Sequence, residues 1–268
     1  LMAACTANYI YRNGGADITV VEKNERPARK LMITGKGRCN VCNNCDIDTL
    51  IANVPENGRF LYSAFSGFAP QDTMTFFESL GVSLKTERGN RVFPVSDKAS
   101  DIVDALVKAA KRGGSEIIQG TAKKILTENG AVSGVLLENG EALPADSVIL
   151  ATGGMSYPLT GSTGDGYKIA RALGHTVTEI MPSLVALNAH EGFCERLAGL
   201  SLKNVALSVF EEGRKKPVFS ELGEILFTHF GISGPLVLSA SAHMRYIGKK
   251  QYTAAIDLKP GLTPEQLD

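Results

Sequence analysis

Apolar residues at the start of the chain follow first a helical and then a strand pattern. From Leu1 to Asn13 they recur at helical spacing, and two glycines then predict the end of the helix. A short β-branched run follows, from Asp17 to Glu22, with an acid as its last residue. This order is typical of the second half of a βαβ unit. We therefore expect the first strand and the glycine-rich loop of that unit to lie just upstream of Leu1.

The next part of the chain alternates polar segments with helices and strands. Residues 26–58 are rich in Gly and Asn and lack periodicity, which predicts a long loop. The apolar pattern then predicts two helices, Pro70–Leu80 and Asp97–Arg112, and three strands, Ser115–Gln119, Ala122–Leu126 and Val132–Leu137. Because Glu-Asn-Gly at 128–130 and at 138–140 favours tight turns, we expect a small antiparallel meander.

A second glycine-rich region follows a predicted buried strand, Ser147–Ala151. Two glycines after this strand leave no side chains that would keep a ligand away from the backbone. Further glycines in 160–166 precede a predicted helix, Tyr167–Leu173. A helix N-terminus of this kind is suited to binding an anion.

The pattern changes after Pro182. Leu202–Glu211 alternates as a strand, 215–230 is expected to be extended or irregular, and Gly234–Tyr246 predicts a helix. Another strand is predicted at Gln251–Leu258, and Thr263 is expected to cap a further helix. We interpret 1–184 as one incomplete domain and 185–268 as the first part of an inserted domain with strands and helices.

Composition narrows the range of partners. The chain has 28 Lys and Arg against 28 Asp and Glu, so no long-range field would recruit nucleic acid or an anionic membrane. No apolar run is long enough for a membrane span, and the start lacks the pattern of a signal peptide. We expect a cytoplasmic protein with reduced thiols, a small-molecule substrate, and neither nucleic acid nor membrane as partner.

Two features indicate where a nucleotide would bind. Glu22, at the end of a parallel strand, has the position of the acid that accepts hydrogen bonds from ribose hydroxyls in dinucleotide-binding folds, although a solvated surface acid would look the same. The loop 29–40 combines glycines with Lys30, Lys36 and Arg38, a set suited to a pyrophosphate or a flavin ring. An ordinary basic surface loop remains the alternative.

Longer strings carry a resemblance to a known family. VVEKN (20–24), RKLMITGKGRCNVCN (29–43), ATGGMSYPLTGSTGDGYKIARALGH (151–175), PSLVAL (182–187) and GEILFTHFGISGPLVLSAS (223–241) occur in this order. Together they resemble the YhiN/BaiN-type family of NAD(P)/FAD-dependent oxidoreductases over nearly the whole chain. The resemblance implies an α/β fold, in which a Rossmann-like FAD-binding domain carries an inserted β-barrel-like and helical domain. Here the first strand, the glycine loop and the C-terminal return to the FAD domain would be missing.

The resemblance also implies roles for individual residues. Glu22 would bind the adenosine ribose, and Ala122 would lie behind the adenine. The complete set expected to bind FAD is Glu22, Lys23, Lys30, Thr34, Gly35, Gly37, Arg38, Cys39, Asn40, Ala122, Ala151, Thr152, Gly153 and Gly154. NAD(P)H is the implied electron donor, with oxygen as an open alternative for the second substrate. No catalytic side chain, metal ligand or substrate is assigned.

Two other function classes stay open. Cys39, Cys42 and Cys45 have the spacing of iron–sulfur ligands, which a metal-thiolate protein would use, but no fourth ligand is evident. The same fold without redox turnover would be a nucleotide- or RNA-associated binding module. His229 is a candidate acid or base, although a histidine between aromatic residues is more often part of a core.

Overall fold

The computed structural model describes residues 1–12, 14–263 and 266, and the chain forms two compact units, 1–177 and 178–268. The predicted helix start at Thr263 falls partly outside the described residues. No helix in the described part of the chain is long and apolar enough to cross a membrane.

A short parallel sheet organises the first unit. β1 (Thr19–Glu22) pairs with β5 (Glu116–Gln119) from Thr19–Glu116 to Glu22–Gln119, as expected for a βαβ-type arrangement. α1 (Met2–Ile10) packs on α5 (Ala99–Arg112), which confirms the helix predicted at 97–112 and whose apolar residues are mostly buried. Buried Asn8 joins the two helices, because its Nδ2 donates to Ala110 O at 2.9 Å and its Oδ1 accepts from Ser115 Oγ at 3.1 Å.

The prediction of one long loop over 26–58 is wrong. The segment contains a 3₁₀ helix η1 (Leu31–Gly37), a short strand β2 (Cys42–Asn43) and a helix α2 (Ile47–Ala52). Asp46 caps α2, since its side chain accepts from Thr49 N at 2.7 Å. The capping residue is visible in the sequence, but α2 is too short for its apolar residues to show a helical period, so the sequence does not predict it. Three further helices follow: η2 (Gly58–Leu61), α3 (Tyr62–Gly67) and α4 (Pro70–Ser79).

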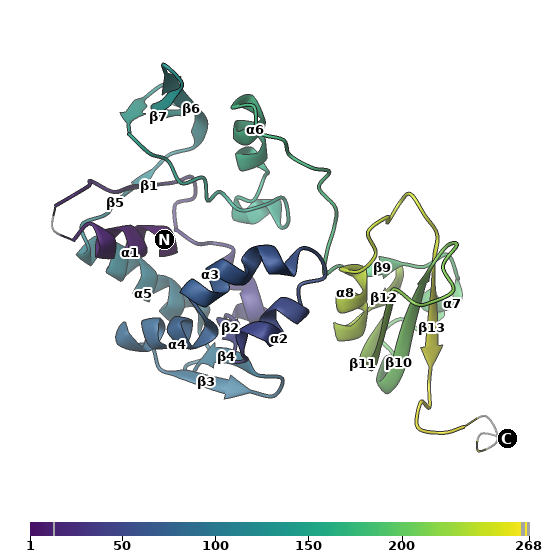
Figure 1. The fold of residues 1–268 in the computed structure, drawn as a ribbon. Coiled ribbons are helices and arrows are strands. Elements are labelled where there is room, and N and C mark those ends of the chain that lie inside the picture. Colours follow the sequence, from purple (N-terminus) through teal and green to yellow (C-terminus); the bar gives the residue numbers. More distant parts are fainter. Residues whose placement is uncertain (13, 264–265, 267–268) are drawn as a thin grey trace. The chain divides into compact units, whose positions relative to one another are not determined.

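Two small antiparallel sheets complete the strands of the first unit (Figure 1). In one, β4 (Arg91–Pro94) lies between β2 and β3 (Leu84–Glu87). The other confirms the predicted meander, with β7 (Ala131–Leu137) between β6 (Ala122–Glu128) and β8 (Ala142–Pro144). Cys39, Phe77, Ile102 and Leu106 belong to a buried apolar cluster that joins the segment after η1 to α4 and α5.

The prediction of a buried strand at 147–151 is also wrong. These residues form no strand in the structure, and Ile149 and Leu150 are 71% and 38% exposed. A strand needs a neighbour to accept its backbone hydrogen bonds, and no described strand pairs with this segment. After a 3₁₀ turn, η3 (Pro158–Thr160), the chain enters α6 (Asp165–Ala172), which confirms the predicted helix with an earlier start.

The second unit is an antiparallel sheet covered on one face by a helix. Its strand order is β13 (Tyr252–Asp257), β10 (Ser201–Glu211), β11 (Phe219–Thr228), β12 (Gly231–Ser233) and β9 (Leu187–Asn188). α8 (Pro235–Ser241) packs on the sheet, and α7 (Phe193–Arg196) lies near β11 and β12. Alternate residues of β10 form the core with Ile225, Phe227, Leu236 and Val237.

One prediction for this unit is confirmed and another needs correction. The segment 215–230, predicted as extended or irregular, is extended over β11, which pairs with β10 on one side and β12 on the other. The helix predicted to reach Tyr246 ends at Ser241. The Ser241 hydroxyl donates to Leu238 O and accepts from Val185 N, so this residue ties the helix end to the chain before β9 instead of extending it.

Candidate functional site

Glu22 lies at the carboxyl end of β1, and one of its two carboxylate oxygens accepts hydrogen bonds from the protein. Its Oε1 accepts from the N–H of Asn24 at 2.9 Å and from Asn24 Nδ2 at 2.8 Å. Among the described residues nothing donates to Oε2, which leaves this oxygen available to a ligand. The Asn24 amide also donates to Thr160 O at 3.2 Å. Glu22 is therefore held in a fixed orientation next to the glycine-rich loop 160–166.

Lys23 connects the end of β1 to the start of α6. Its Nζ lies 2.7 Å from Asp165 Oδ2 and 2.7 Å from Thr163 Oγ1. The hydrogen bond from Lys23, followed by that from Thr163, lowers the pKa of Asp165 to about 2. Asp165 is the first residue of α6, where a negative charge also interacts favourably with the helix dipole. The helix N-terminus predicted to bind an anion thus carries a carboxylate of its own.

The other candidate residues of the first unit come from three separate segments. Lys30 Nζ donates to Ser156 Oγ at 2.9 Å, which joins the start of η1 to the loop after residues 151–154. The N–H of Gly120 donates to Glu22 O at 3.0 Å, and Ala122 begins β6 two residues later. Residues 151–153 are exposed, and Gly153 has a φ of +76°, which favours glycine. The contacts of Asn24 with Thr160 and of Lys30 with Ser156 therefore tie two candidate segments to the stretch of chain that follows the second glycine segment.

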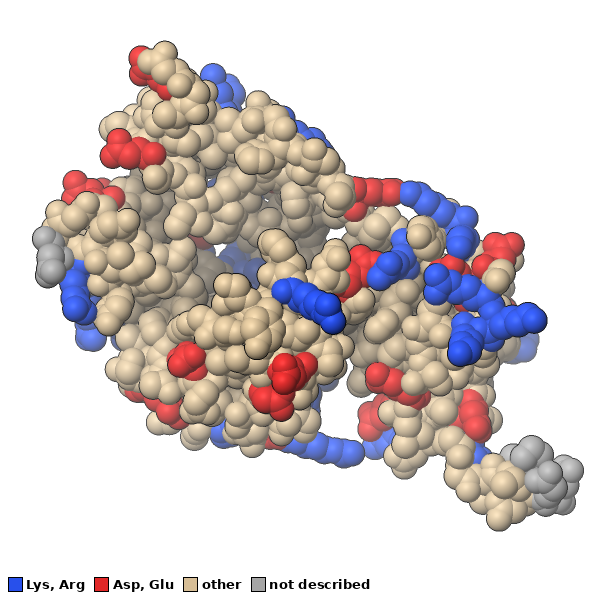
Figure 2. All heavy atoms as spheres, viewed as in Figure 1, with Lys and Arg blue, Asp and Glu red and all other residues tan. Residues whose placement is uncertain are grey.

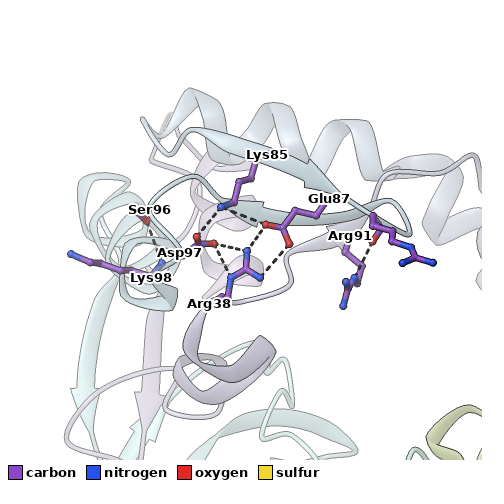
Figure 3. Close-up of polar contacts among 8 residues, drawn as sticks. Arg38, Lys85, Glu87, Arg91, Ser96, Asp97 and Lys98 are labelled. Carbon is purple, nitrogen blue, oxygen red and sulfur yellow. Dashed lines mark hydrogen bonds and ion pairs between the residues drawn. The ribbon is translucent and has the colours of Figure 1, made fainter. Parts of the chain in front are cut away.

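Arg38 takes part in a four-residue ion cluster (Figure 3). Its guanidinium contacts Glu87 Oε1 at 2.5 Å and Asp97 Oδ1 at 2.6 Å, and Lys85 Nζ lies 2.8 Å from Asp97 Oδ2. The guanidinium also lies 4.1 Å from the centre of the Phe93 ring. The hydrogen bond from Arg38 lowers the pKa of Glu87, and the hydrogen bond from Lys85 lowers that of Asp97. Arg38 thus fixes the end of η1 to the β3–β4 hairpin, and both carboxylates face its charge.

The segment between Thr34 and Asn40 has an unusual backbone. Gly35, Lys36 and Cys39 have φ values of +55°, +58° and +61°. A Cβ at Gly35 would lie 2.9 Å from Asn40 N, so only glycine fits there without movement. In the orientation that satisfies both ends of its amide, Asn40 donates to Cys42 O at 3.0 Å and Val92 O at 3.2 Å. Lys36 and Gly37 remain exposed, which leaves backbone and one cation accessible to a ligand.

The three clustered cysteines do not form a metal centre. Cys39 is buried in the apolar cluster, and burial raises the pKa of its thiol. Cys42 Sγ points to Pro70 O at 3.9 Å. Within the described residues no group of three or more His, Cys, Asp or Glu side chains is placed to hold a metal ion. The geometry therefore gives the metal-thiolate alternative no support.

Glu22 and the two glycine segments are candidates that the sequence predicts, but the side chains that connect them are not. Asn24, Ser156, Thr163 and Asp165 were not predicted, and each of them has a partner more than a hundred residues away in sequence. His229 belongs to the second unit, where it is exposed beside Phe230 at the turn between β11 and β12. The expectation that this histidine lies in a core is wrong, because the turn directs it out of the sheet.

Comparison with known proteins identifies the family. The model of the HI0933-like protein Rossmann domain matches residues 1–242. The chain belongs to this family. The match confirms the resemblance to YhiN/BaiN-type flavoproteins and the Rossmann-like α/β fold class.

Two curated relatives cover most of the chain. It is 32% identical over 259 residues to the 3-dehydro-bile acid delta(4,6)-reductase of Clostridium scindens, covering 95% of the chain and 61% of the relative. It is 30% identical over 230 residues to the ribosomal RNA dihydrouridine synthase of Escherichia coli, covering 85% and 55%. The chain thus spans a little over half the length of these relatives.

A solved structure shares the fold. The Escherichia coli quinol fumarate reductase subunit FrdA aligns with a TM-score of 0.51 and 17% identity, covering 75% of the chain and 41% of that protein. At this identity the likeness concerns the fold alone.

Proposed function

We propose that the first unit binds FAD and belongs to a reductase of carbon–carbon double bonds conjugated to a carbonyl group. The proposal rests on the position of Glu22 at the end of a parallel strand. Asn24 holds its Oε1, and its Oε2 stays available. A carboxylate oxygen at this position can accept hydrogen bonds from the ribose hydroxyls of a dinucleotide. Family membership supports the same assignment.

The residues of the region fit the remaining parts of FAD. Exposed backbone at 35–37 and 151–153 can approach the cofactor closely, because glycines interrupt both segments. Lys30 and Lys36 would face the pyrophosphate, and Ala122 would lie behind the adenine. Arg38 has a different role in this proposal, because Glu87 and Asp97 hold its charge. It would position the loop instead of contacting the phosphates.

We infer the reaction class from a chemical feature that the substrates of the two relatives share. A delta(4,6) bile acid with a 3-oxo group and the uracil ring of uridine each contain a double bond conjugated to a carbonyl. When bound, FAD would pass a hydride equivalent from NAD(P)H to the carbon β to the carbonyl. A proton added at the α carbon completes the reduction. The substrate itself is either a small unsaturated ketone or a uridine in RNA, and the expectation that nucleic acid is no partner stays a prediction.

An absorbance titration tests the proposal. The protein is purified, its flavin bands are recorded, and FAD is added while binding and thermal stability are measured. We expect saturable binding that raises the melting temperature, followed by bleaching of the flavin bands when NAD(P)H is added without oxygen. Re-oxidation by an α,β-unsaturated ketone or by uridine-containing RNA would identify the acceptor. A protein that neither contains FAD nor gains stability from it would contradict the proposal.

A further inference from the structure

One end of the second unit carries two basic loops that lie side by side. The first loop, 212–218, connects β10 to β11, and the second, 242–251, connects α8 to β13. β10 and β13 are neighbours, with Glu211 opposite Tyr252, and the N–H of Glu212 donates to Gln251 O at 3.0 Å. Segments far apart in sequence therefore form a single surface at this end of the sheet.

Positive charge is concentrated on this surface. The two loops contain six cationic residues: Arg214, Lys215, Lys216, Arg245, Lys249 and Lys250. Figure 2 shows Lys and Arg side chains gathered over this part of the second unit. Because the whole chain has a formal net charge of zero, the excess is local and the overall composition hides it.

A buried carboxylate fixes the base of both loops. Glu211 is 3% exposed, and its Oε1 lies 2.6 Å from Lys250 Nζ and 3.3 Å from Arg214 Nε. Its Oε2 accepts from the hydroxyl of Tyr252 at 3.2 Å. The hydrogen bond from Lys250 lowers the pKa of Glu211, which keeps the carboxylate charged. Through their contacts with Glu211, Lys250 and Arg214 therefore hold the two loops together.

Three of these cations, all of them lysines, are available to an anion. Lys215 and Lys216 are exposed, and no acidic side chain among the described residues pairs with either of them. Lys249 pairs with Glu179, but both side chains are more than half exposed, so a phosphate can replace this carboxylate at little cost. Three lysines on two adjacent loops thus face solvent.

An aromatic ring lies among these charges. Tyr246 is 41% exposed, and its N–H donates to the Tyr252 hydroxyl at 3.0 Å, which anchors its backbone. Lys250 Nζ lies 4.7 Å from the centre of the Tyr246 ring. Cations that contact phosphates beside an exposed ring that stacks on a base are the combination by which proteins bind single-stranded RNA. An anionic membrane or free phosphate would use the lysines but not the ring.

We propose that this end of the sheet is an RNA-binding surface. Lys215, Lys216 and Lys249 contact the phosphate backbone, and Tyr246 stacks on an unpaired base. The proposal rests on the proposed reductase function, for which it selects RNA as the substrate class. Its binding readout is independent of flavin, so the two proposals fail separately.

Fluorescence anisotropy with a labelled, uridine-containing RNA stem–loop tests the surface. We compare the wild-type protein with the double variant Lys215→Glu/Lys216→Glu and with Tyr246→Ala. The charge reversal is expected to weaken binding at least ~10-fold and to reduce the slope of log Kd against log salt by about 1.5. Loss of the ring is expected to weaken binding roughly 10-fold with little change in that slope.

The matched control is Lys203→Glu/Lys259→Glu, which makes the same charge change at the opposite end of β10 and β13. It should bind RNA much more tightly than Lys215→Glu/Lys216→Glu, and circular dichroism should show all variants folded. Equal weakening by both double variants, or no RNA binding, would overturn the proposal. So would binding to phosphatidylserine vesicles that depends on the lysines, together with RNA binding that is insensitive to Tyr246. Reduction of a small ketone by a protein that does not bind RNA would leave the reductase function intact.

Discussion

Lys23 Nζ lies 2.7 Å from Asp165 Oδ2, which joins the residue directly after β1 to the first residue of α6 across most of the first unit's sequence. The contact places the glycine-rich loop 160–166 beside Glu22. Together with the contacts of Asn24, it helps to fix the geometry of the proposed ribose site.

This pair predicts a pH-dependent stability. The pKa of Asp165 is lowered to about 2 from its ordinary 3.8, so its contribution is fully present above the ordinary value and is lost as the pH falls towards 2. Asp165→Asn should reduce the free energy of unfolding by ~1 kcal/mol at neutral pH, a value discounted for partial exposure. The difference from wild type should shrink between about pH 5 and pH 2, as measured by urea unfolding.

The matched control for this experiment is Asp146→Asn. Asp146 is exposed and has no ion-pair partner among the described residues, so its substitution should leave the free energy of unfolding unchanged. A difference for Asp165→Asn that stays constant over the acidic range would show that Lys23 does not stabilise the carboxylate.

Glu22→Gln should weaken FAD binding. The carboxylate would accept charge-assisted hydrogen bonds from ribose hydroxyls, worth ~1.5–3 kcal/mol. The expected change is therefore about 10- to 100-fold in Kd, measured by titration of flavin fluorescence. Glu25→Gln is the control, because Glu25 is exposed and lies three residues beyond Glu22, the last residue of β1. Equal affinities for Glu22→Gln and wild type would place the ribose elsewhere.

The sequence predicts a helix or strand well where a local pattern of residues determines it. It predicts poorly where the element depends on a partner that is distant in sequence. The β6–β7–β8 meander follows from alternating residues and Asn-Gly turns, and both signals are local. Residues 147–151 have the composition of a buried strand, yet no described strand pairs with them. Glu22 is a candidate for ribose binding because of its position at the end of a strand, which is a local signal. Its connections through Asn24 and Lys23 depend on tertiary contacts that no spacing in the sequence encodes.

Arg38 should act on loop stability more than on phosphate binding. Arg38→Lys removes the planar fork that contacts two carboxylates, and should lower the melting temperature by roughly 2–4 °C. Arg26→Lys is the control, because the Arg26–Asp104 pair is exposed and contributes little. Differential scanning calorimetry at low and high salt measures both. An unchanged melting temperature together with strongly weakened FAD binding would indicate that Arg38 turns to the pyrophosphate.

Gly166 controls how closely α6 approaches the segment 151–154. A Cβ on Gly166 would lie 2.3 Å from Thr152 Oγ1, which is too close for any real contact. Gly166→Ala should therefore displace Thr152 and cost ~1–3 kcal/mol in the free energy of unfolding. Gly67→Ala is the control, since a Cβ there meets nothing within 4 Å and its φ is not positive.

A double variant separates this steric effect from a general loss of helix stability. Thr152→Ala removes the hydroxyl that the new methyl group would meet, so Gly166→Ala should be much better tolerated in the Thr152→Ala background. Because the two residues are in contact, their effects should be non-additive by more than ~0.5 kcal/mol. Additive effects would mean that the methyl group disturbs α6 itself. If FAD binding recovers along with stability in the double variant, the approach of α6 to 151–154 shapes the cofactor region; recovery of stability alone would confine the role of Gly166 to packing.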